Sequence, residues 1–210
     1  MRISTVIKAL LAVTAVTPLL CHAESNLNTG GGSPLATTAH VDFQIAIPKF
    51  VFLRIGSGTG SATGGWAATA TVDLISFAPT PAQVGTGLLN ATAASGDLGN
   101  GVETAVVVAN GGDVTFSSTA SAGLSDGAGD NISWATILTT AAHNSTGTTL
   151  QAPALANGAT TSITLTAVGK VVQQDAKWTY QYANGTIPPA GTYGGVNVNG
   201  GRVTYTASVL

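Results

Sequence analysis

The clearest alternation of apolar and polar residues in the chain spans positions 41–47. The apolar positions are Val41, Phe43, Ile45 and Ile47. Because successive side chains of a strand point to opposite faces, this alternation predicts a β-strand with four apolar side chains on one face. Pro48 is expected to end or bend this strand, because proline has no N–H to donate within a sheet.

The rest of the chain repeats short strand-like patterns between turn-forming residues. Residues 50–55 are apolar on both faces and end at Gly56, which predicts a buried strand. Further strands are expected at 69–77, 104–109, 114–118, 132–139, 162–168, 177–183 and 202–209. A tight hairpin is expected at 110–113, whose Asn-Gly-Gly-Asp sequence tolerates positive φ. This spacing of strands and turns predicts an all-β fold, an antiparallel β-sandwich.

Composition supports this interpretation, because the chain has 27 Gly and only 8% charged residues. It lacks the Glu, Lys, Arg and Leu that favour exposed helix faces. Residues 24–39 are Gly- and Ser-rich and predict a flexible leader. Residues 40–210 are long enough for one β-sandwich domain with a single core.

The N-terminal 23 residues have the pattern of a signal peptide. Arg2 and Lys8 give a basic start, residues 9–20 are apolar, and Ala23 supplies a small residue for cleavage. Export is therefore expected. The alternative is a lipoprotein signal with lipidation of Cys21, although residues 18–20 lack the small side chains that such processing prefers.

Two classes of partner are disfavoured by the mature sequence. The formal net charge of −2 becomes more negative once Arg2 and Lys8 are removed, which argues against nucleic acid. No apolar run after Ala23 reaches the roughly 18 residues of a membrane helix, so no membrane span is expected in the mature chain. Cys21 is the only cysteine, so no disulfide is expected to stabilise the fold.

The alternating segment at 41–47 has two interpretations. It can pair within its own domain, or it can reach a neighbouring subunit and complete that subunit's sheet by strand addition. In the second case Val41, Phe43, Ile45 and Ile47 are the candidate residues of strand exchange. Sequence alone leaves both open.

The two ends of the mature chain resemble bacterial fimbrial subunits. The features that carry this are the apolar strand near the mature N-terminus, the turn at 191–193 and the closing strand at 203–206. The resemblance implies an immunoglobulin-like or pilin-like sandwich completed by a strand from a periplasmic chaperone and then from the next subunit. It also implies passage through the periplasm to the cell surface or beyond. Many such subunits carry a disulfide, and the Gly-rich stretch at 194–201 makes this chain longer.

Catalytic and metal-binding patterns are sparse. Only His40 and His143 follow the signal peptide, which is little for a Ser-His-Asp triad or a zinc site. The nine acidic residues lie mainly in turns, so neither an enzyme nor a cofactor is expected. Residues 125–131 offer oxygen ligands for Ca²⁺ but lack the closing Glu of an EF-hand, so a plain loop is favoured.

One aromatic pattern offers a binding alternative. Trp178, Tyr180 and Tyr182 share one strand face, which can serve either as core or as a platform for sugar stacking, with core packing favoured. The sequence therefore predicts a secreted, non-catalytic structural or adhesive protein. One hypothesis is a fimbria-like subunit that forms homo-oligomers or joins other surface subunits. The other is a monomeric carbohydrate- or surface-binding module.

Overall fold

The computed structural model describes residues 24–209. They fall into two units, one that ends at Ile47 and one that begins at Pro48. The predicted signal peptide, residues 1–23, lies outside the described residues. The compact unit thus begins at Pro48 rather than at residue 40.

All strands belong to the unit that begins at Pro48. They are β1 (Val51–Ile55), β2 (Gly87–Asn90), β3 (Val102–Ala109), β4 (Val114–Ala120), β5 (Leu124–Ser125), β6 (Asn131–Ile132), β7 (Ile137–Ala142), β8 (Thr160–Leu165), β9 (Val172–Asn184) and β10 (Val203–Val209). A single 3-10 turn, η1, spans Trp134–Thr136. Within residues 24–209 no helix has the length and apolar character of a membrane span. The all-β prediction is confirmed.

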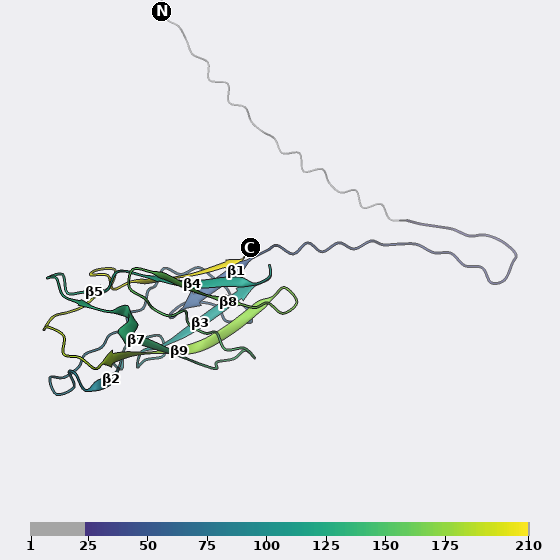
Figure 1. Cartoon of the computed structure of the whole chain (residues 1–210). Coiled ribbons are helices and arrows are strands. Elements are labelled where there is room, and N and C mark those ends of the chain that lie inside the picture. The colour runs from purple at the N-terminus through teal and green to yellow at the C-terminus, as the bar shows by residue number, and fades with distance from the viewer. Residues whose placement is uncertain (1–23, 210) are drawn as a thin grey trace, which may run out of the picture. The chain divides into compact units, whose positions relative to one another are not determined.

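The strands form two larger antiparallel sheets, consistent with a β-sandwich (Figure 1). In the first sheet β1 pairs with β3, and β3 pairs with the long strand β9. Strand β2 follows β3 along the same side of β9, while β7 pairs on the other side. In the second sheet β4 lies between β10 and β8. Strands β5 and β6 form a separate short ribbon.

The main core lies between these two sheets. Val107 of β3 and Trp178 of β9 face Phe116 of β4 and Leu165 of β8, and all four are buried. A smaller cluster on the outer side of the first sheet joins Val106 and Val108 to Ala62, Phe50 and Phe52. Alternation of buried and exposed residues along β4 and β9 reflects the period of two in a half-buried strand.

Three sequence expectations differ from the structure in strand pairing. The turn at 110–113 joins β3 to β4, which belong to different sheets, so it is a crossover between layers rather than a hairpin. Its Gly112 has φ 117° and its N–H donates to the carbonyl of Lys170. Residues 69–77 and 41–47 are in no strand, although both alternate in sequence. Alternation predicts which side chains share a face, but a strand also needs a partner edge.

Candidate functional site

Residues 41–47 present an apolar surface that no strand covers, and they are called the assembly segment below. The exposed fractions of its apolar side chains are 75% for Val41, 90% for Phe43, 86% for Ile45 and 77% for Ile47. Figure 1 draws this stretch without a strand arrow. Single exposed apolar residues are ordinary, but a contiguous exposed row of large ones is typical of an interaction site.

Asn110, directly after β3, binds the residues that lead into β1. Its side-chain Nδ2 donates to the carbonyl of Pro48 over 2.8 Å, and its Oδ1 accepts from the N–H of Phe50 over 2.8 Å. The backbone N–H of Asn110 also donates to the carbonyl of Phe50. These three hydrogen bonds fix the start of the compact unit beside the end of β3.

The compact unit has an incompletely covered side, where β1 ends the first sheet and β10 ends the second. Strands β1 and β10 lie near each other. On β4, in the middle of its sheet, the core-facing residues are fully buried, whereas those of β10 are all only partly buried. An edge strand with an incompletely buried core face is a surface on which another strand can add.

Residues 69–78, called the unpaired segment below, lie on this same side. Ile75 and Phe77 pack against the main core. The backbone of this stretch is held at Ser76, whose N–H donates to Ser95 Oγ and whose carbonyl accepts from the N–H of Thr92. The unpaired segment is therefore placed like a strand, with Ile75 and Phe77 against the core and no strand hydrogen-bonded beside it.

A groove of about 910 Å³ lies between the unpaired segment and β10, and we call it the interlayer groove. One wall comes from residues 71–79, and the other includes Val203 and Tyr205. The floor is made by core side chains, among them Trp134 and Tyr180. Such a groove, apolar with a few polar groups, is the ordinary form of a binding site.

Two carboxyl groups meet in the wall and floor of this groove. Glu103 is 3% exposed, and no hydrogen-bond donor among the described residues reaches its Oε2. A Cβ at Gly56, where φ is +75°, would overlap both this oxygen and Asp73 Oδ2. Only glycine fits under the pair. Burial, and then the negative charges of Asp73 and Asp97, raise the pKa of Glu103 to about 8.

Arg54 of β1 forms an ion pair with Asp97 rather than with Glu103. Arg54 Nη2 lies 3.2 Å from Asp97 Oδ2, and the guanidinium also donates to the carbonyls of Gly56 and Gly60. Asp97 Oδ1 accepts from the N–H of Thr104. Asp97 is thus paired with the cation Arg54, whereas Glu103 and Asp73 approach each other as two acidic groups. This pair was missed from sequence because the expected strand began at residue 104, although an acid inside an apolar run was the available signal.

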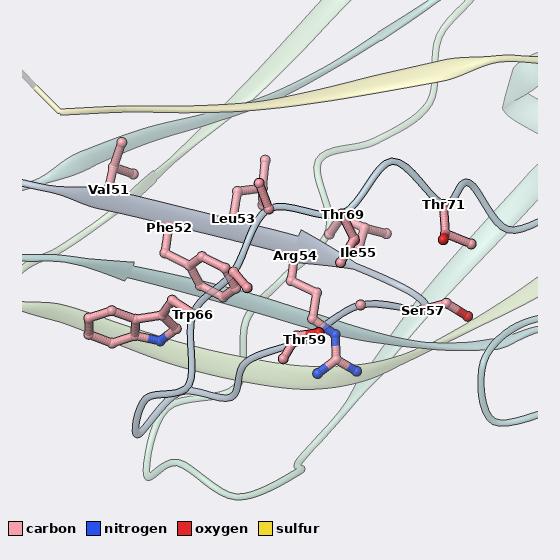
Figure 2. A pocket seen from close by; sticks show the side chains of 13 residues that line it. Val51, Phe52, Leu53, Arg54, Ile55, Ser57, Thr59, Trp66, Thr69 and Thr71 are labelled. Carbon is pink, nitrogen blue, oxygen red and sulfur yellow. The ribbon is translucent and has the colours of Figure 1, made fainter.

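A second, smaller hollow of about 450 Å³ lies beside β1 (Figure 2). Trp66 packs on Phe50 and Phe52, with ring centroids 4.7 Å and 6.0 Å apart, and remains 42% exposed. Thr59, Thr69 and Thr71 also line it. It shares the lining residues Ile55 and Thr71 with the interlayer groove.

The expected aromatic binding face is part of the core. Trp178, Tyr180 and Tyr182 are 0%, 6% and 8% exposed. Trp178 Nε1 donates to the carbonyl of Leu150, and Tyr180 Oη bonds to Tyr205 Oη over 3.0 Å. These side chains hold the two sheets together and cannot stack on an external sugar.

The remaining candidate sites are scattered or already satisfied. His40 and His143 are both exposed, and His40 Nδ1 lies 2.8 Å from Glu24 Oε2. In the loop at 125–131, Asp126 Oδ1 accepts the N–H groups of Ala128, Gly129 and Asp130. These bonds close an ordinary turn around the carboxylate. Over residues 24–209, no three His, Cys, Asp or Glu side chains are grouped so as to hold a metal ion.

Asp175 is the most heavily hydrogen-bonded carboxylate of the described chain. It is buried on β9 and accepts from Asn144 Nδ2, from the hydroxyl and N–H of Ser145, and from the hydroxyl and N–H of Thr146. Every one of these bonds anchors the loop after β7 to β9. Its role in the described chain is structural.

Comparison of the chain with protein-family models, with curated proteins and with solved structures found no match.

Proposed function

We propose that this chain is an exported, non-catalytic structural subunit that assembles with copies of itself at the cell surface by strand addition. The observation that carries the proposal is the assembly segment. It has four large apolar side chains in alternation, each at least three-quarters exposed, and no strand among residues 24–209 pairs with it. The same chain has an edge strand, β10, whose core-facing residues are only partly buried.

The energetics favour such pairing. Full burial of an apolar side chain of this size contributes about 1.5–3 kcal/mol, so four of them provide a strong driving force before the cost of association. Main-chain hydrogen bonds to an edge strand add directional strength. The polar positions of the segment, Asp42 and Gln44, would stay on the solvent side, as an added edge strand requires.

Export rests on the N-terminal sequence, with its basic start and apolar stretch before Ala23. The immunoglobulin-like or pilin-like topology, a periplasmic chaperone as a transient partner, and joining to other surface subunits are parts of the same proposal. They rest on the resemblance of the two chain ends to fimbrial subunits.

The test is the oligomeric state of the purified mature chain over a wide range of concentration, measured by size-exclusion chromatography with light scattering. The unaltered chain is expected to form a ladder of oligomers. Phe43→Asp places a charge on the apolar face of the assembly segment and is expected to leave only monomer. Gln44→Asp adds the same charge on the opposite face and is the matched control, expected to assemble as the unaltered chain does.

A clean monomer at every concentration would refute self-assembly. It would favour the monomeric surface-binding module, for which the exposed ring of Trp66 beside β1 is the remaining aromatic candidate. Equal loss of assembly in Phe43→Asp and Gln44→Asp would show that the alternation of the segment is not what pairs it.

A further inference from the structure

The interlayer groove lacks a strand in the place where the two sheets approach each other. It is lined by the unpaired segment, by residues 188–197 and by the start of β10, and β10 pairs only with β4 among the described residues. Ile75 and Phe77 on one side and Tyr205 on the other already belong to the main core. A strand laid between them would cover that core and satisfy the free edge of β10.

The assembly segment has the alternation that an edge beside β10 requires. The part of β10 that lines the groove contributes Val203 and Tyr205, two side chains on one face of the strand. The apolar side chains of the segment occupy every second position, which matches the partly buried positions of β10. In its own chain the apolar side chains of the segment are at least three-quarters exposed, so they are available to another copy.

The floor of the groove imposes a chemical condition on whatever fills it. Glu103 faces Asp73 from the unpaired segment and Asp97 from the loop before β3, while Arg54 of β1 is paired with Asp97. Tyr180 of β9 and Tyr205 of β10 face it from the remaining sides and are bonded to each other. Burial raises the pKa of Tyr205 to about 12, so this phenol stays neutral and adds no second negative charge. Arg202, which also lines the groove, is exposed.

An apolar strand over this floor removes the remaining water from Glu103 without bringing a charge to balance it. The face formed by Val41, Phe43, Ile45 and Ile47 carries no ionisable group. A buried carboxylate without a partner is strongly unfavourable, whereas a protonated carboxyl can donate its hydrogen bond to Asp73. The uncharged face of the segment therefore complements the groove only when this acid pair holds a proton.

We propose that the assembly segment of a second copy of this chain lies in the interlayer groove, between the unpaired segment and β10, and that its binding requires a proton on the Glu103–Asp73 pair. This inference rests on the proposed function, since it names the acceptor of the strand addition. It adds a location for the acceptor and a dependence of assembly on pH.

The location is tested by crosslinking between two variants of the mature chain. Apart from Cys21 in the predicted signal peptide, the chain has no cysteine. Phe43→Cys is mixed in denaturant with Leu74→Cys or Val203→Cys, one in each wall of the groove, and the pair is refolded together. A short bis-maleimide then links nearby thiols, and the linked peptides are identified by mass spectrometry. The matched control is Thr164→Cys, exposed on β8 at the opposite edge of the same sheet as β10.

Links from position 43 to positions 74 and 203 but not to position 164 are the expected result. If oligomers form and the link is instead to position 164, the groove is not the acceptor and the location is overturned, while self-assembly stands. If no oligomer forms under any condition, the proposed function itself fails and this inference fails with it.

The proton requirement is tested by the dissociation constant of the oligomer between pH 6 and pH 9.5. In the unaltered chain it is expected to change little up to about pH 8, because the pKa of Glu103 keeps it protonated there. Above that pH it should rise by up to tenfold per pH unit, as for uptake of one proton on binding. Glu103→Gln keeps the shape and carries no charge, so its dissociation constant is expected to stay flat.

A pH dependence in Glu103→Gln equal to that of the unaltered chain would overturn the proton requirement. Circular dichroism establishes that the variant is folded. If it is not, Asp73→Asn provides the second test, because removing the neighbouring charge should move the onset of dissociation to lower pH. An unmoved onset in a folded Asp73→Asn would equally overturn it.

Discussion

Trp178 of β9 packs its ring against that of Tyr205 of β10, with centroids 5.4 Å apart and an angle of 50° between the planes. Phe116 of β4 lies 6.0 Å from both rings. The three aromatic side chains come from both sheets and meet where the interlayer groove borders the core. Tilted ring pairs of this kind add about 0.5–1.5 kcal/mol each beyond the area that they bury.

The first prediction compares two tryptophans in different surroundings. Trp178→Ala is expected to lower the free energy of unfolding by about 3–5 kcal/mol, because it empties the centre of the core and leaves the Leu150 carbonyl without its donor. Trp66→Ala, at a half-exposed ring, is expected to cost only about 1–2 kcal/mol. Urea unfolding followed by circular dichroism measures both. Equal losses would contradict the assignment of Trp178 to the centre of the core.

The sequence predicted the strands that have an uninterrupted apolar pattern. It did not predict strand residues that are stabilised by contacts with a segment distant in sequence. The apolar run before Gly56 and the final alternating stretch are β1 and β10. Strand β9 was predicted too short, because Gln173, Gln174 and Asp175 look like loop residues. The carboxylate of Asp175 is buried only because a loop distant in sequence supplies its donors.

Of the two surfaces that we propose to pair, only the assembly segment was predictable from the sequence. The alternation at 41–47 was visible as an apolar face, and its exposure in the structure agrees with a segment that lacks a partner in its own chain. The acceptor half was not predictable, because the interlayer groove is built by the unpaired segment, β9 and β10, which lie far apart in sequence. The Glu103 and Asp73 pair likewise exists only through the turn at Gly56.

The second prediction concerns pH and the stability of the single subunit, independent of assembly. The pKa of Glu103 is about 8 in the folded state, above its ordinary value of 4.5. The folded state therefore binds this proton more tightly than the unfolded state does. Its favourable contribution is complete below pH 4.5 and is lost as the pH rises from there to about 8.

Glu103→Gln is accordingly expected to flatten the fall in Tm between pH 5 and pH 8, and to be more stable than the unaltered chain at pH 8, by an amount on the order of a few kcal/mol. Scanning calorimetry at four pH values measures this, in the Phe43→Asp background so that assembly does not contribute. Asp42→Asn, which removes an exposed acid, is the control. A variant with the same slope as its parent would show that Glu103 is not the titrating group.

The third prediction tests the anchor at Asp175, which ties the loop after β7 to β9. Burial alone would raise the pKa of this carboxyl, but the hydrogen bonds donated by Ser145 and Thr146 outweigh it and hold the pKa below its ordinary value. Asp175→Ala leaves these donors without their acceptor and is expected to cost about 2–4 kcal/mol of stability. Asp113→Ala, which removes a carboxylate that accepts from the Ala167 N–H, is the matched control, expected to cost about 1 kcal/mol.

The sign of the pH effect at Asp175 is opposite to that at Glu103. Because its pKa is depressed in the folded state, its contribution is present above pH 3.8, the ordinary value, and is lost as the pH falls toward the folded pKa. Unfolding by acid should therefore be less steep below pH 4 in Asp175→Asn than in the unaltered chain, although the variant is less stable at pH 7. Acid titrations of both proteins, followed by tryptophan fluorescence, measure the slopes. Parallel slopes would mean that another carboxylate controls acid unfolding, and that the loop after β7 opens before Asp175 takes up its proton.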